Sequence, residues 1–295
     1  MQLCAHAPPW EKSPTTCGPP SARTTPRCDL VQEAHSVWDR VVEDWLAEHP
    51  HPAWRRHSDD VNGALLARWL PERSDGTLLK TDLFDEIAAD GLHSVLASRA
   101  KKVCGIDVSA YTARAVSKKY PDIAACAADI RRLPFADSSF DTIVSLSTAD
   151  HFADPADIVR SIEELQRVLR PGGTLVITMD NLSNPLIALR NSLPYSVLRR
   201  IGLVSYPLGQ TFTFGRAREC VASAGFEVLE CVGLMLAPRV IAIPVIELAS
   251  RHGSNGMTKR LRNALMWMEK FQANIVAPRL AHFVAIRAIK PAEPL

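Results

Sequence analysis

The chain has 295 residues, of which 34 are Lys or Arg and 32 are Asp or Glu, so its formal net charge is +2. This length accommodates one large α/β domain with appended segments, or two small domains. The nearly balanced charge excludes an electrostatic argument for nucleic acid as the partner. No uninterrupted apolar stretch reaches the length of a membrane span, because the nearest one, residues 234–249, contains Pro238, Arg239, Pro244 and Glu247.

The amino-terminal residues 1–28 are rich in Pro, Ser and Thr, and we expect them to form a disordered tail. They lack the basic start and the apolar run of a signal peptide. The seven cysteines include no CxxC pair, and their odd number favours reduced thiols and a cytoplasmic location.

Residues 29–75 are predicted to form a helical extension. Trp38, Val42 and Trp45 recur at helical spacing, and a second helix is expected over 61–70. Two tryptophans on one helix face indicate either a helix that packs on the neighbouring domain or a lid over an active site.

The segment 76–180 alternates between strand and helix patterns, which predicts an α/β fold with a parallel sheet. The strands are expected at 77–82, 103–107, 123–129, 140–146 and 174–179. Helices are expected at 84–99, from Ser109 to about Tyr120, and from Asp154 to a stop at Pro171-Gly172-Gly173. The first three strands end in Asp82, Asp107 and Asp129, so these carboxylates should converge on the ligand crevice at the carboxyl edge of the sheet.

The remaining chain is predicted to complete the sheet and to cover the crevice. Residues 181–211 and 237–275 read as two inserted cap segments, with a helix at 215–224 between them. Strands are expected at 226–236 and 282–289, the last one antiparallel. A helix in the second insertion should bury the side chains on one face, Leu261, Leu265, Met268 and Ile275, and the run Met266-Trp267-Met268 is expected to be core.

Four motifs in this order resemble those of class I S-adenosylmethionine-dependent methyltransferases of the type 11 group. They are Gly105-Ile106-Asp107-Val108-Ser109, Ala128-Asp129-Ile130-Arg131-Arg132-Leu133-Pro134-Phe135, Ser139-Phe140-Asp141-Thr142-Ile143-Val144, and Leu165-Gln166-Arg167-Val168-Leu169-Arg170-Pro171-Gly172-Gly173-Thr174-Leu175. The resemblance implies a Rossmann-like sheet of seven mostly parallel strands with helices on both faces, within a methyltransferase domain over 76–295. It also implies S-adenosyl-L-methionine as the cofactor.

The first motif of that family departs from its usual form in this chain. The family has an acidic residue followed by a glycine-rich turn, whereas this chain has Lys80-Thr81-Asp82-Leu83-Phe84-Asp85-Glu86. The glycines normally allow the backbone to approach the ligand closely. We therefore expect the methionine end of the cofactor to sit differently here, with Asp82 contacting its ammonium or sulfonium region. A degenerate pocket that binds nothing is the alternative.

The cofactor contacts that follow from the resemblance lie at the strand ends. Asp107 is expected to accept hydrogen bonds from the ribose hydroxyls, and Asp129 from the adenine amino group. Alternatives are a helix cap for Asp107 and a solvated turn for Asp129. The full set of expected cofactor contacts is Lys80, Thr81, Asp82, Asp107, Val108, Asp129, Ile130, Ser147 and Thr148.

The loop after the fourth strand carries the candidate catalytic residues. His151 is the expected general base, because a histidine titrates near neutrality, and Asp150 is its candidate orienting partner. Packing alone is the alternative role for His151. Substrate contacts are expected from Asn184, Tyr206 and Arg239, although a surface salt bridge is an alternative for Arg239. No metal is expected, because neighbouring acids such as those at 82, 85 and 86 also suit a helix start.

The predicted function is methyl transfer to a small, fairly apolar molecule, with oxygen slightly favoured over carbon or nitrogen as acceptor. One alternative is a methyltransferase of a lipid or polyprenyl quinone at the membrane surface. Another is a catalytically silent protein that binds a partner through the Trp38 and Trp45 face. We expect a small-molecule substrate, no nucleic acid and no stable membrane insertion, and a homodimer stays open.

Overall fold

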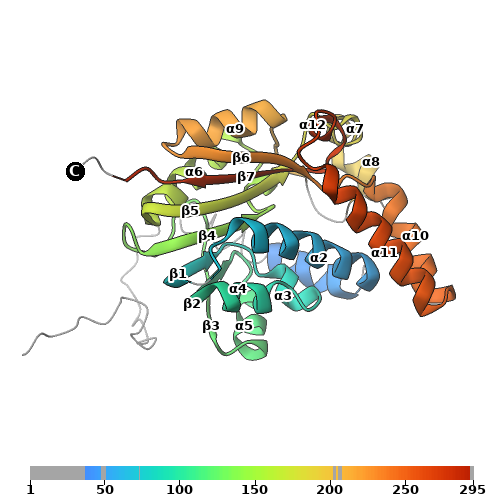
Figure 1. The fold of residues 1–295 in the computed structure, drawn as a ribbon, viewed down its shortest axis with the longest axis horizontal. Coiled ribbons are helices and arrows are strands. Elements are labelled where there is room, and N and C mark those ends of the chain that lie inside the picture. Colours follow the sequence, from blue (N-terminus) through green and yellow to red (C-terminus); the bar gives the residue numbers. More distant parts are fainter. Residues whose placement is uncertain (1–36, 48–50, 73, 202–203, 205–207, 293–295) are drawn as a thin grey trace, which may run out of the picture.

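The computed structural model describes residues 37–47, 51–72, 74–201, 204 and 208–292. Its centre is a seven-stranded sheet with the strand order β3-β2-β1-β4-β5-β7-β6 (Figure 1). The strands are β1 Ser74–Lys80, β2 Ala100–Asp107, β3 Ile123–Ala127, β4 Phe140–Leu146, β5 Leu169–Asp180, β6 Glu227–Leu234 and β7 Phe283–Ile289. The pairs among β1 to β5 are parallel, and β7 is antiparallel to both β5 and β6. The predicted α/β, Rossmann-like fold is therefore confirmed.

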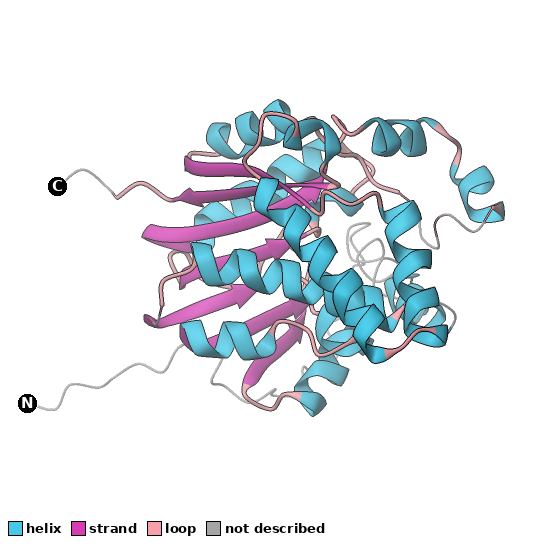
Figure 2. Ribbon diagram, turned by 45° about the vertical axis from the view of Figure 1, so that its right-hand side comes forward, coloured by secondary structure: helices cyan, strands magenta, loops and turns pink. Residues whose placement is uncertain are grey.

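Helices cover both faces of this sheet (Figure 2). One core cluster joins the sheet to α2 (Pro52–Trp69), α4 (His93–Arg99), α5 (Ala110–Lys119), α10 (Arg239–His252) and α11 (Asn255–Met268). The cluster on the other face includes side chains of α6 (Pro155–Val168) and α9 (Phe214–Ser223). Strand β4 lies between the two helical layers, since Phe140 and every residue from Thr142 to Leu146 are buried.

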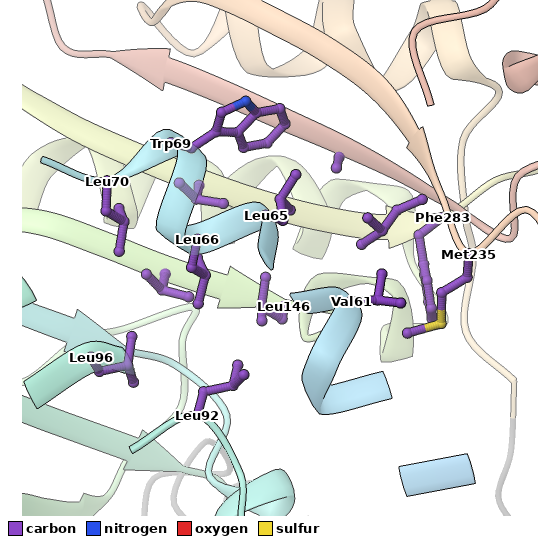
Figure 3. Packing of buried hydrophobic residues seen from close by; sticks show 14 of the residues in the cluster. Val61, Leu65, Leu66, Trp69, Leu70, Leu92, Leu96, Leu146, Met235 and Phe283 are labelled. Carbon is purple, nitrogen blue, oxygen red and sulfur yellow. The ribbon is translucent and has the colours of Figure 1, made fainter. Parts of the chain in front are cut away.

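Helix α2 is a layer of the core, and it is longer than the predicted helix at 61–70. It begins at Pro52, where proline is tolerated because the first helical N–H groups have no intrahelical partner. Leu66 and Trp69 are completely buried against the sheet, as Figure 3 shows. Burying one such side chain contributes roughly 1.5–3 kcal/mol. This part of the predicted extension is thus held firmly on the domain.

The single helix expected over 84–99 is wrong, because the structure divides it into α3 (Phe84–Ala88) and α4. Gly91 lies between them with φ of +65°, a left-handed conformation that ends a helix. A Cβ atom at this position would lie 2.8 Å from Glu86 Cα. The break allows Glu86 Oε1 to accept a hydrogen bond from the Leu92 backbone N–H at 3.1 Å.

Two further boundaries differ from the sequence prediction. The run Pro171-Gly172-Gly173 lies inside β5 and not in a helix stop, since α6 already ends at Val168. The second insertion contains two long helices, α10 and α11, and Pro244 lies within α10. Because α11 ends at Met268, Ile275 falls beyond its buried face and is 91% exposed, and Trp267 is exposed as well.

The inserted segments form a cap beyond the carboxyl ends of the parallel strands. Besides α10 and α11 it contains α7 (Pro185–Ser192), α8 (Tyr195–Arg200) and α12 (Ala277–Leu280). Figure 1 shows these five helices together at one end of the molecule. Within the described residues, no helix combines the length and the hydropathy needed to cross a bilayer.

Candidate active site

A cavity of about 980 Å³ lies between the carboxyl edge of the sheet and the cap. Most of the predicted site residues line it, namely Thr81, Asp82, Asp107, Val108, Asp129, Ile130, Ser147, Thr148, His151, Asn184 and Arg239. Two predicted site residues, Lys80 and Asp150, are absent from this lining. Tyr206 lies outside the described residues. The structure therefore brings residues from strand ends, loops and cap together in one space.

The turn after β1 is held by a buried ion pair. Lys80 Nζ lies 2.8 Å from Glu86 Oε2, both side chains are almost fully buried, and Lys80 also donates to the carbonyl of Asp82. The ammonium group is thereby engaged inside the turn, which explains why Lys80 does not reach the cavity. Leu83 packs on Gly105, where an added Cβ would meet a Leu83 methyl at 2.6 Å. A salt bridge and one leucine thus shape the turn that glycines form elsewhere.

Asp107 presents a buried carboxylate at the end of β2. Its two oxygens accept hydrogen bonds from the backbone N–H groups of Leu83, at 3.0 Å, and Ser109, at 2.7 Å. Burial and the nearby charge of Asp82 raise the pKa of Asp107 to about 7. Each carboxylate oxygen retains a further lone pair. This pair of acids suits a ligand that brings hydroxyl or ammonium donors.

Asp129 is paired with Arg131, a residue that the sequence analysis did not single out. The guanidinium contacts both oxygens of Asp129, with Nη2 at 2.6 Å, and its Nη1 lies 2.7 Å from Asp157. The guanidinium carbon is 4.8 Å from the centre of the Phe152 ring. The Asp-x-Arg spacing was the available signal, but the second carboxylate comes from α6. Asp129 is therefore an ordered carboxylate whose charge is compensated by Arg131.

The loop after β4 is fixed by Asp150. The Ser147 hydroxyl donates to both Asp150 oxygens, at 3.0 and 3.2 Å, and the Asp180 backbone N–H donates to Oδ2 at 2.8 Å. Burial and the neighbouring Asp180 raise the pKa of Asp150. Ser147 has φ of +51°, an unusual conformation for a residue other than glycine. Through these contacts Asp150 holds the backbone of the loop in place, and His151 is the next residue of that loop.

The helix at 37–47 covers part of the cavity, which Trp38, Val42 and Trp45 line. The Trp38 ring packs edge-on against His151 with 5.1 Å between centroids, and Trp45 packs in the same way on Phe84 at 4.8 Å. Asp39, which the sequence analysis did not single out, accepts hydrogen bonds at the start of α5.

Those Asp39 bonds come from the Ser109 hydroxyl, at 2.5 Å, and the Tyr111 backbone N–H, at 3.0 Å. A carboxylate is favoured at the amino end of a helix, because the unpaired N–H groups there carry partial positive charge. The amino-terminal helix is thus anchored next to the expected ribose site.

A polar cluster lies at the cap side of the cavity, where β5 and β7 end. Asp180 forms an ion pair with Arg190, and His282 Nε2 lies 3.3 Å from Asp180 Oδ1. Burial would raise the pKa of Asp180, but His282 and the Arg190 guanidinium lower it overall. Burial and the charge of Arg239 lower the pKa of His282 to about 4, so its ring is neutral at pH 7.

Arg239 is the second cation of this cluster, and like Arg190 it lines the cavity. Its Nη1 lies 3.0 Å from His282 Nε2, and its guanidinium carbon lies 5.7 Å from the centre of the Trp54 ring. It forms no ion pair with a carboxylate among the described residues, so the surface salt bridge considered as its alternative role is not found there. The two guanidinium groups of Arg190 and Arg239 and the one carboxylate of Asp180 give the cluster a net charge of about +1, next to the apolar lining of the cavity.

The rest of this end of the cavity is apolar, and its polar residues serve the backbone. Asn184 caps α7 through its side-chain oxygen and donates to the carbonyls of Leu280 and Ala281. The apolar side chains come mainly from α7 and α10 and include Leu186, Ile187, Leu189, Leu193, Val240, Ile243 and Pro244. Among the described residues, no group of three or more His, Cys, Asp or Glu side chains has the arrangement of a metal site.

Comparison with known sequences agrees with this geometry. A family model described as a methyltransferase domain matches residues 88–177. A Mycobacterium tuberculosis protein named "Probable S-adenosylmethionine-dependent methyltransferase" is 23% identical over 290 residues, covering 97% of this chain and 93% of the relative. The 2-phytyl-1,4-naphtoquinone methyltransferase of Nostoc punctiforme is 30% identical over 173 residues, covering 53% of this chain and 68% of the relative.

Solved structures share the fold at low sequence identity. Phosphoethanolamine N-methyltransferase 2 of Haemonchus contortus, determined in complex with S-adenosyl-L-methionine, superposes with a TM-score of 0.52 and 17% identity. The superposition covers 85% of this chain and 60% of that chain. At this identity the similarity concerns the architecture alone.

Proposed function

This chain belongs to the class I S-adenosylmethionine-dependent methyltransferases, and we propose that it methylates an oxygen atom of a small, mostly apolar acceptor. The observation that carries this proposal is that one connected cavity has carboxylates at the strand ends and apolar side chains under the cap. A charged, hydroxyl-rich cofactor and an apolar acceptor require these two different surfaces in one connected space.

The residues at the sheet edge fit the cofactor, which supplies an electrophilic methyl group on a sulfonium when it is bound. In our proposal, Asp107 with Val108 receives the ribose, and Asp129 with Ile130 receives the adenine. The methionine end then lies along the remaining lining of this region, Thr81, Asp82, Ser147 and Thr148. Lys80 is left out of the proposed contacts, because its ammonium group is engaged with Glu86.

The cap side orients the acceptor. The apolar lining excludes water from the acceptor and aligns it, and alignment is the main contribution of the protein to a displacement reaction. Arg239 donates hydrogen bonds to an acceptor oxygen and stabilises negative charge on it. His151, which lines the cavity, takes the proton of a hydroxyl acceptor. Asp150 positions the loop that carries this histidine.

A quinone or another lipid-like acceptor is the second candidate, and one observation favours it. The relative from Nostoc punctiforme, at 30% identity, is named for a phytyl naphthoquinone substrate. The apolar lining from α7 and α10 would suit an isoprenoid chain, and Arg239 would then contact a ring oxygen.

The test uses the purified full-length protein with methyl-labelled S-adenosylmethionine and a panel of phenols, reduced naphthoquinones and primary amines. We expect label in the oxygen acceptors, and His151→Ala should lower turnover by about 10²–10⁴-fold without changing cofactor affinity. His93→Ala is the matched control. His93 lies on α4, pairs with Asp122 and does not line the cavity. Label only in reduced naphthoquinones favours the second candidate. Label only in amines, or unchanged turnover in His151→Ala, contradicts the role of this histidine as base.

A further inference from the structure

Charge is distributed unevenly between the cap and the rest of the chain. The segments 181–211 and 235–282 contain ten Lys or Arg and only two acidic residues, Glu247 and Glu269. The remainder of the chain contains 24 basic and 30 acidic residues. Both acids of the cap are buried, Glu247 at 5% and Glu269 at 8% exposure. The described surface of the cap therefore presents positive charge with no exposed carboxylate to balance it.

Seven exposed cations of the cap have no carboxylate partner in the described part of the chain. They are Arg199, Arg200, Arg251, Lys259, Arg260, Lys270 and Arg279. Within the described residues, the cap cations that form ion pairs are Arg190, with Asp180, and Arg262, with Asp60. Exposed cations without partners keep their charge available for an external anion.

The same surface exposes most of the large apolar side chains of the molecule. Fifteen of the eighteen exposed large apolar side chains in the described chain lie in the cap segments 181–211 and 235–282. Ile201, Ile241 and Leu248 have exposed fractions of 64%, 62% and 62%. Concentration of such side chains in one region indicates an interaction surface, because apolar residues on a free surface are normally scattered.

This surface is continuous with the entrance to the cavity. Leu189 of α7, Val240 of α10 and Leu280 of α12 line the cavity and are also 54–60% exposed. Figure 1 shows the cap helices at one end of the molecule, away from α5. We call the exposed side chains of α7, α8, α10, α11 and α12 the cap face.

From these observations we propose that the cap face docks on the surface of a bilayer that contains anionic lipids. Anionic headgroups pair with the exposed Arg and Lys side chains, while the exposed Ile, Leu, Val and Trp side chains enter the interface between headgroups and acyl chains. The charge complementarity selects a negatively charged partner, and the density of apolar side chains selects a lipid surface over a nucleic acid. Docking places the cavity entrance at the membrane, whether or not the acceptor proposed above is correct.

Vesicle co-sedimentation tests this proposal without substrate or cofactor. The full-length protein is mixed with vesicles of phosphatidylcholine that contain about 30 mol % phosphatidylglycerol, and with pure phosphatidylcholine vesicles. We expect binding to the anionic vesicles that weakens as salt is raised. The double variant Arg199→Glu/Arg200→Glu should lower the partition coefficient about tenfold or more. The double variant Ile241→Ser/Leu248→Ser should lower it several-fold through the loss of apolar contact.

The control is Arg114→Glu/Lys118→Glu on α5, which makes the same change of charge at exposed positions outside the cap. This control should bind like the unmodified protein, and circular dichroism should show that all three variants are folded. Equal loss in the control and in the cap variant would overturn the proposal. Recovery of the unmodified protein entirely in the supernatant at low salt would overturn it as well. If the unmodified protein forms dimers and does not bind vesicles, and Ile241→Ser/Leu248→Ser dissociates those dimers, the cap face binds a second copy of the chain instead. If the protein binds a model RNA in preference to vesicles, the cap face binds nucleic acid instead.

Discussion

Asp107 illustrates how one carboxylate serves both the fold and the site. It accepts the backbone N–H groups of Leu83 and Ser109, and so it joins the turn after β1 to the start of α5. The same carboxylate lines the cavity beside Asp82, where burial and the like charge raise its pKa to about 7. The folded protein therefore holds this group close to the midpoint of its titration at neutral pH.

The raised pKa predicts opposite pH dependences for stability and for cofactor binding. The Asp107 carboxyl binds its proton more tightly in the folded protein than in the unfolded chain, where its pKa is about 3.9. Protonation of Asp107 therefore adds to the free energy of unfolding, and this gain is complete below about pH 4. It is lost as pH rises to about 7. Cofactor affinity should instead rise over pH 6–7.5, since the ionised carboxylate is the better acceptor for ribose hydroxyls.

Urea unfolding and calorimetry across this pH range measure both trends. Asp107→Asn should flatten both and weaken cofactor binding by about tenfold or more, since a hydrogen bond to a charged group contributes about 1.5–3 kcal/mol. Asp137→Asn, at an exposed carboxyl, should leave both slopes intact. Cofactor affinity in Asp107→Asn equal to that of the unmodified protein would remove Asp107 from the ribose site.

At the scale of an element, the turn between β1 and α3 shows how a different set of contacts replaces the glycine-rich form. The buried pair of Lys80 and Glu86 spans the turn, and Glu86 also accepts the Leu92 backbone N–H. Gly91, with its positive φ, provides the chain reversal that brings Leu92 to Glu86. The turn itself contains no glycine, and the one position here that needs a positive φ is Gly91, between α3 and α4.

We predict that Lys80→Met destabilises the protein by about 3–5 kcal/mol, because it leaves the Glu86 carboxylate buried without a cation. The double variant Lys80→Met/Glu86→Gln should recover about half of this loss or more, since glutamine is neutral and still accepts from Leu92. Urea denaturation measures both values. Lys101→Met, at an exposed position of β2, should change stability by less than about 0.5 kcal/mol. A double variant as unstable as the single one would show that the pair does not account for the turn.

At the scale of the whole molecule, two covers of different origin close the carboxyl edge of the sheet. The helix at 37–47 packs on His151 and Phe84 through Trp38 and Trp45, while the cap helices enclose the apolar end of the cavity. The helix at 37–47 is attached to the domain by contacts of its own side chains, since Asp39 accepts two hydrogen bonds from the start of α5. Such a cover can loosen without disturbing the core, which α2 secures separately.

Asp39→Ala should therefore raise the rate of backbone hydrogen exchange in residues 37–47 while exchange in β4 and β5 is unchanged. Each lost hydrogen bond contributes about 1 kcal/mol, so cofactor binding should weaken by roughly 3–10-fold if the ordered helix covers the cofactor. Asp44→Ala, at an exposed position of the same helix, is the matched control. Equal exchange rates in the two variants would show that the Asp39 contacts do not hold this helix in place.

Local patterns in the sequence were sufficient to predict the sheet and the line of acids along its edge. Alternating strand and helix patterns with turn signals predict parallel strands, and the carboxyl ends of parallel strands lie at one edge. For that reason Asp82, Asp107 and Asp129 were expected together before any coordinates were considered, and all three line the cavity. The antiparallel last strand was predicted as well, and the structure confirms it.

Tertiary structure alone decided which groups compensate those charges and which surface the cap exposes. Arg131 reaches Asp157 from a different element, and Arg239 meets His282 across 43 positions of the chain. Such pairings depend on how distant segments pack, which no periodicity within a short window encodes. Whether an apolar residue of the cap is buried or exposed likewise depends on its neighbours in space, as Ile275 shows. The sequence determined the frame and the carboxylates, and packing determined their partners.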